Sequence, residues 1–163
     1  SLWGDGEQSA TSAFRHKDAI YVLPSENEWV KAAYWDGTEL NGYSTGDTIV
    51  DGVNYNNADA IWNVGSGVEE LNGTYDMMGN VWEWNESASD GLDNSSDAYR
   101  VFRGGDYESN FTSLKRDSRS SLPGESESDS IGFRVAVVPE PVSLVLIGLF
   151  GGGILVIRRI FMV

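Results

Sequence analysis

The sequence predicts an α+β domain built on an irregular, turn-rich sheet, and three observations lead to this fold class. With 163 residues and 40% hydrophobic side chains, the chain is long enough to bury one core rather than two. One segment has the apolar period of a helix, whereas three short segments alternate apolar and polar side chains as strands do. Between them lie long stretches rich in Gly, Asn, Asp and Ser, which favour turns.

The helix is expected to begin after Ser25. The Ser25 hydroxyl can cap the free N–H groups of the first turn, and Glu28, three residues later, can reach back to the Ser25 N–H. Gly37 then provides a stop after two to three turns. The apolar side chains that share the buried face of this helix are Trp29, Ala32 and Ala33.

Three short strands are expected, over residues 81–84, 99–103 and 132–137. In the first, Trp82 and Trp84 alternate with Glu83, so the two indoles share one face and the carboxylate lies on the other. We expect both tryptophans to pack in the core. Residues 37–72 have no apolar period and should form a long loop region.

Charge and residue counts exclude several classes of function. The chain has 25 Asp and Glu against 11 Lys and Arg, a net charge of −14 that repels phosphate, so nucleic acid is not an expected partner. It has no Cys and one His, which rules out thiolate nucleophiles, disulfides and Cys/His zinc sites. Ser109 and His16 come with no oxyanion motif, and we interpret both as surface residues.

Three motifs follow one another along the chain. They are residues 23–29 (LPSENEW), residues 72–84 (NGTYDMMGNVWEW), and residues 103–105 (RGG) followed by 131–135 (IGFRV). Together they resemble the formylglycine-generating enzyme, or sulfatase-modifying factor, family. The resemblance implies a C-type-lectin-like α+β fold for residues 20–138, loop-rich with short strands. It also implies that the irregular segment 1–19 continues from a front portion that is missing here.

The same resemblance bears on catalysis. Enzymes of the family oxidise a substrate cysteine with two copper-binding cysteines of their own, placed shortly after the Arg-Gly-Gly turn. The matching positions here are Ser109 and Leu114, and neither supplies a thiolate for copper. This implies a non-catalytic domain that binds an unknown surface ligand, a carbohydrate or a protein. The alternative is an atypical oxidoreductase, or a formylglycine-generating enzyme whose catalytic residues lie outside this chain.

Calcium is the cofactor that the resemblance implies. Family members bind it through two side-chain oxygens and two backbone carbonyls, at the positions that match Asp76, Gly79, Val81 and Glu83. Hard oxygen donors of this kind suit Ca²⁺. Asn54 matches a second calcium site of the family weakly, because its acidic partner is not matched. The structural interpretation of the same residues is that Asp76 caps the turn and Glu83 is a solvated strand residue.

Residues 139–163 differ in kind from the rest. The run 142–157 (VSLVLIGLFGGGILVI) carries no charge and lies between Val138-Pro139-Glu140-Pro141 and Arg158-Arg159. As a helix it would measure about 24 Å, so spanning a hydrocarbon core of roughly 30 Å requires local thinning. A buried core helix is the alternative. The tail resembles a PEP-CTERM sorting signal, which implies an exosortase-type processing protease, a transmembrane anchor over 142–157, and export to the cell surface or exterior of a Gram-negative bacterium.

Overall fold

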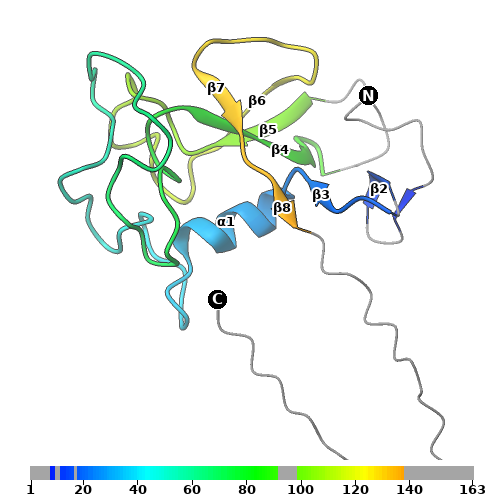
Figure 1. The fold of residues 1–163 in the computed structure, drawn as a ribbon, viewed down its shortest axis with the longest axis horizontal. Helices are drawn as coiled ribbons and strands as arrows, with labels where there is room; N and C mark the ends of the chain where they lie inside the picture. The colour runs from blue at the N-terminus through cyan, green and yellow to red at the C-terminus, as the bar shows by residue number, and fades with distance from the viewer. Residues whose placement is uncertain (1–7, 10–11, 17, 92–98, 138–163) are drawn as a thin grey trace, which may run out of the picture.

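The structure is a computed structural model that describes residues 8–9, 12–16, 18–91 and 99–137. A four-stranded sheet lies at its centre, with α1 on one side of it and the loops of residues 37–80 beyond the C-terminal end of that helix (Figure 1). The elements are β1 (Gln8–Ser9), β2 (Ser12–His16), β3 (Tyr21–Val22), α1 (Glu26–Tyr34), β4 (Trp82–Ala88), β5 (Tyr99–Arg103), β6 (Ser120–Pro123), β7 (Ile131–Phe133) and β8 (Ala136–Val137).

The central sheet has the strand order β6-β5-β4-β7. The pairs β4–β5 and β5–β6 are antiparallel, whereas the edge strand β7 joins β4 in parallel, with Glu83 opposite Gly132. Two smaller antiparallel pairs, β1–β2 and β3–β8, complete the described strands. The α+β class and the loop-rich sheet expected from the sequence are therefore confirmed.

Helix α1 has the capping box that its sequence predicts. The Ser25 hydroxyl accepts from the Glu28 N–H at 3.3 Å, and the Glu28 carboxylate accepts from the Ser25 N–H at 2.8 Å. The helix ends at Tyr34, because Trp35 is already extended. At this end the Asn72 amide donates to the carbonyls of Lys31 and Ala32, and the Lys31 carbonyl also accepts from the Trp35 N–H at 3.3 Å. Asn72 thus helps to satisfy the carbonyl groups at the helix C-terminus.

The strands differ from the prediction in four places. β4 runs four residues beyond the expected end at Trp84, to Ala88. The single strand expected over 132–137 is two strands, β7 and β8, which pair with different partners. β3 and β6 were not predicted, because neither has an apolar alternation. The expectation of an irregular segment over 1–19 is wrong within its described part, where β1 and β2 form an antiparallel pair.

The core is small and centres on the helix. Trp29 and Tyr34 meet edge to face at 5.9 Å between ring centroids, beside the buried Ala33 and Met77. The expectation that Trp82 and Trp84 pack in the core is confirmed only in part. Both are half-buried, and each packs edge-on against Phe102.

No helix within the described ranges is long and apolar enough to cross a membrane. The apolar helix expected over 142–157 lies outside the described residues.

Candidate functional site

Glu83 lies at the centre of a buried polar cluster under the sheet. Its side chain is 7% exposed, and Arg134 holds both of its oxygens, through Nε at 2.5 Å and Nη2 at 2.6 Å. The indole N–H of Trp29 donates to the same carboxylate at 2.7 Å. The interpretation of Glu83 as a solvated strand residue is therefore wrong. Burial lowers the pKa of Arg134, but hydrogen bonding and charge from Glu83 outweigh it and raise that pKa overall.

Asp76 faces a different part of the molecule. Its backbone is in the left-handed region (φ +56°), a conformation that Asp and Asn tolerate better than most residues. Its Oδ2 accepts from the Gly65 N–H at 2.7 Å, across eleven residues of loop. The Asp76 side chain thus anchors the loop that precedes it. The Asp76 backbone carbonyl accepts from Arg134 Nη2 at 3.3 Å.

Asn54 and Asn80 form a second fastening point for the same loop. Asn54 Nδ2 donates to the Ala60 carbonyl at 3.0 Å and to Asn80 Oδ1 at 3.1 Å. The Asn80 amide accepts from the Trp62 N–H at 2.8 Å and donates to the Trp62 carbonyl at 3.3 Å. Both asparagines are almost fully buried, and the backbone at Asn80 is left-handed.

The other two residues of the expected calcium set belong to the turn that joins these clusters. Gly79 has φ +76° and donates its N–H to the Gly104 carbonyl at 2.8 Å. A Cβ at Gly79 would lie 2.2 Å from the Asn54 carbonyl oxygen, so only glycine fits there. Val81 is half-buried, and its side chain lies against Gly132.

The residues expected to bind calcium differ in how well they suit that ion. Glu83 does not fit as a ligand in this arrangement, because a guanidinium and an indole already use both of its oxygens. Asn54 does fit, because its Oδ1 is buried and accepts no hydrogen bond, and such an oxygen suits a hard cation. The part of the chain that the structure describes has no group of three or more His, Cys, Asp or Glu arranged to hold a metal.

Ser109 and Leu114, the positions expected to match the family's redox cysteines, both lie against Gly105. A Cβ placed on Gly105 would be 3.3 Å from Ser109 Cβ and 3.5 Å from Leu114 Cγ. The Ser109 hydroxyl donates to Asp106 at 2.6 Å, while His16 accepts from the Asp18 N–H, so neither interaction joins Ser109 to His16. Leu114 is fully buried.

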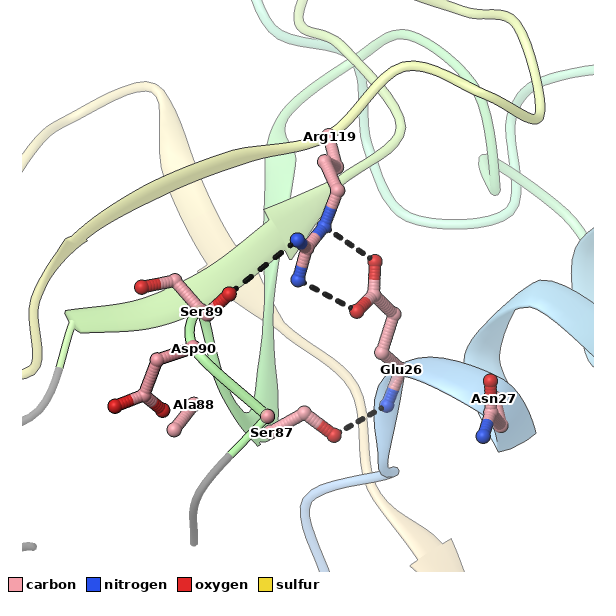
Figure 2. Close-up of a pocket in the computed structure, with 8 residues that line it drawn as sticks. Glu26, Asn27, Ser87, Ala88, Ser89, Asp90 and Arg119 are labelled. Carbon is pink, nitrogen blue, oxygen red and sulfur yellow. Dashed lines mark hydrogen bonds and ion pairs between the residues drawn. The ribbon is translucent and has the colours of Figure 1, made fainter.

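An open pocket lies where the start of α1 meets the end of β4 (Figure 2). It has a volume of about 500 Å³, and a paired carboxylate and guanidinium, Glu26 and Arg119, form one wall, with contacts of 2.9 and 2.8 Å. Ser87 accepts from the Glu26 N–H at 3.0 Å. The pocket therefore offers hydrogen-bonding groups to a polar ligand. Its lining residues are Glu26, Asn27, Ser87, Ala88, Ser89, Asp90, Gly91 and Arg119.

Sequence reasoning missed two residues that organise these clusters, Asn80 and Arg134. Both lie within the motifs quoted above, Asn80 beside Gly79 and Arg134 in the Gly-Phe-Arg run. In so acidic a chain the sequence predicts that Arg134 pairs with a carboxylate, but not with which one, and it gives Asn80 no side-chain role. The signal for Arg134 was its position in a strand with apolar residues on either side. An arginine there needs a buried acid, and Glu83 is that acid.

Comparison with known proteins shows which family this chain belongs to. Three similar solved structures are Treponema denticola variable protein 1 (24% identity, TM-score 0.63), CarF (28%, 0.58) and PvdO from Pseudomonas aeruginosa (24%, 0.50). They match 73%, 71% and 71% of this chain but 48%, 46% and 51% of their own, so the chain spans about half their length. No curated protein matches the sequence. Residues 3–138 match the sulfatase-modifying factor enzyme 1-like domain, and the chain belongs to that family.

Proposed function

We propose that this chain is a non-catalytic binding domain of the sulfatase-modifying factor fold. One observation carries the proposal. The family's enzymes resemble this chain but carry two redox cysteines, and the residues expected at those two positions here are Ser109 and Leu114. Both residues lie against Gly105, and neither side chain offers a thiolate to copper. Leu114 has no donor atom, and the Ser109 hydroxyl is engaged by Asp106.

What remains at this place supports a structural role. Leu114 is fully buried, and its carbonyl accepts from the Tyr34 hydroxyl at 3.0 Å. Burial of that phenol raises its pKa, which keeps the hydroxyl protonated and able to donate. A domain with a rigid scaffold and exposed loops is suited to binding, because loops on such scaffolds vary at little cost to the fold.

The proposal includes calcium as a stabilising ion. The buried, unpartnered Oδ1 of Asn54 and the excess of acidic residues support it, and when bound the ion would supply a hard positive charge between loop oxygens. Among the four residues expected at the family's main calcium site, Asp76 is a better candidate ligand than Glu83, because Arg134 already binds the Glu83 carboxylate.

The proposal also includes export and attachment at a bacterial surface through the C-terminal tail. The support is in the sequence: an uncharged run over 142–157, with Pro-Glu-Pro before it and two arginines after it. The partners would be a membrane, an exosortase-type processing protease, and a surface ligand that is a carbohydrate or a protein.

The test of the catalytic question is direct. The purified chain is incubated with a sulfatase-type cysteine peptide, copper and oxygen, and the peptide is weighed by mass spectrometry. We expect an unchanged thiol mass, under conditions in which an active enzyme of the family converts the peptide. Copper-dependent formation of an aldehyde would overturn the proposal.

A variant pair sharpens this assay. Ser109→Cys combined with Leu114→Cys places thiols at both of the expected redox positions, which lie against Gly105, and Ser109→Cys alone places one. Copper(I) binding by the double variant, without binding by the single one, would show that the missing thiol pair is what separates this chain from a copper protein.

A further inference from the structure

The loop over residues 60–66 exposes apolar side chains to an unusual degree. Val64 is 96% exposed, Ile61 46% and Trp62 38%, and every residue from 60 to 66 is exposed. Scattered apolar residues on a surface need no explanation, but three within four positions of one loop form a local apolar cluster.

This loop is held in place from beneath. The buried amides of Asn54 and Asn80 fix its first part through the backbone at Ala60 and Trp62. Asp76 fixes its end by accepting from the Gly65 N–H at 2.7 Å. Four side-chain hydrogen bonds, all of them to the loop's backbone, therefore present its side chains outward.

A fixed loop with exposed apolar side chains is suited to recognition. Ordering a flexible loop on binding lowers affinity, and a loop already held in shape avoids that loss. Aromatic side chains are enriched among the residues that contribute most to protein interfaces, and here Trp62 is the residue held most tightly through its backbone.

The charge around the loop favours one kind of partner. The chain has no Lys, Arg or His between Lys31 and Arg100. Exposed acids lie near the loop in the sequence: Asp59 precedes it and Glu69 follows it. The Val68 N–H donates to the Gly52 carbonyl at 3.0 Å, so the backbone that carries the exposed Asp51 pairs with the segment just after the loop. A cationic partner gains from this field, and an anionic one is repelled.

We propose that residues 60–66 form the docking surface for a basic polypeptide segment that carries aromatic or large aliphatic side chains. Its apolar side chains would cover Ile61, Trp62 and Val64, and its lysines or arginines would face the flanking acids. This inference rests on the proposed binding function and gives that function a surface and a class of partner.

The test uses the full chain and a short synthetic peptide of repeating Lys-Phe-Gly-Ser units, with binding followed by calorimetry. Two matched peptides replace Lys by Glu, or Phe by Ser. Val64→Ser removes the most exposed apolar side chain of the loop, and Val137→Ser makes the same change at an exposed valine on β8. Neither substitution touches the hydrogen bonds that hold the loop.

We expect the Lys-Phe peptide to bind, added salt to weaken it, and both matched peptides to bind far less. Val64→Ser should lower the affinity about tenfold, and Val137→Ser should leave it unchanged. Absence of binding, or equal binding by the two variants, would overturn the inference. So would Val64-dependent binding of phosphatidylcholine vesicles without peptide binding, because the surface would then recognise lipid. Failure of the non-catalytic proposal is a separate result, aldehyde formation in the thiol assay.

Discussion

Replacing Arg134 by Ala should destabilise this domain far more than an ordinary surface substitution would. The change removes both charge-assisted hydrogen bonds to Glu83, whose side chain is 7% exposed, and leaves the carboxylate with the Trp29 indole alone. Breaking a buried ion pair on one side costs about 3–5 kcal/mol. Because Arg134 itself is 28% exposed, we expect the lower end, about 3 kcal/mol. For a chain of this size that lowers the melting temperature by about 6–12 °C.

Urea denaturation followed by tryptophan fluorescence measures this effect, with an unchanged slope against urea as the check that the folded state is intact. Glu83→Gln should cost less, about 1–2 kcal/mol, because Arg134 can then turn to water. The double variant Glu83→Gln/Arg134→Ala should cost less than the sum of the two single changes, with a coupling of about 2 kcal/mol. A loss under 1 kcal/mol for Arg134→Ala, or strict additivity, would refute the idea of a buried charge that depends on its partner.

Three further predictions concern the helix cap, calcium and the tail. Arg15 beside Glu28 lowers the pKa of the Glu28 carboxyl to about 2. The stabilising contribution of Glu28, which is full above pH 4.5, should therefore fade as the pH falls toward 2. When the melting temperature is followed as the pH is lowered, Glu28→Gln should show a shallower decline than the unmutated chain. Calcium at a hundredfold excess over its Kd should stabilise the chain by about 2.7 kcal/mol, and Asp76→Ala should remove most of that gain; identical melting curves in calcium and chelator would show that no such site exists. Expressed with an export signal, the full chain should fractionate with membranes and a chain ending at Val138 should not; equal solubility of the two, with the tail intact by mass, would rule out the anchor.

The local parts of the fold could be predicted because their causes are local. The cap of α1 depends on Ser25 and Glu28, three residues apart, and both hydrogen bonds form as the spacing requires. Strand β5 occupies the predicted residues 99–103. Likewise, the alternation in β4 correctly placed Trp82 and Trp84 on one face, where both contact Phe102.

The alternation of apolar and polar side chains in β4 does not indicate which of its two faces is buried. Burial of the Glu83 face depends on Arg134, fifty-one residues later, and on the Trp29 indole, fifty-four residues earlier. Arg134 also marks the break between β7 and β8, where one predicted strand becomes two strands with different partners. Such long-range pairs leave no periodic pattern in the sequence. The roles of Asn54 and Asp76 as loop anchors leave no periodic pattern either, because each binds backbone groups of an irregular loop six or eleven residues away.

Three arginines of this domain face inward, and that has a consequence for its behaviour in salt. Arg15, Arg103 and Arg134 each bind a carboxylate whose side chain is partly or wholly shielded from water. Pairs of this kind are screened weakly by dissolved ions, whereas repulsion between exposed acids fades once the Debye length shrinks to about 8 Å at physiological ionic strength. With these three cations turned inside, negative charge dominates the surface of a chain that already has 25 acids against 11 Lys and Arg, and counter-ions from the medium reduce the repulsion. Moderate ionic strength should therefore raise the stability of this domain, the opposite of the response expected where exposed ion pairs hold a fold together.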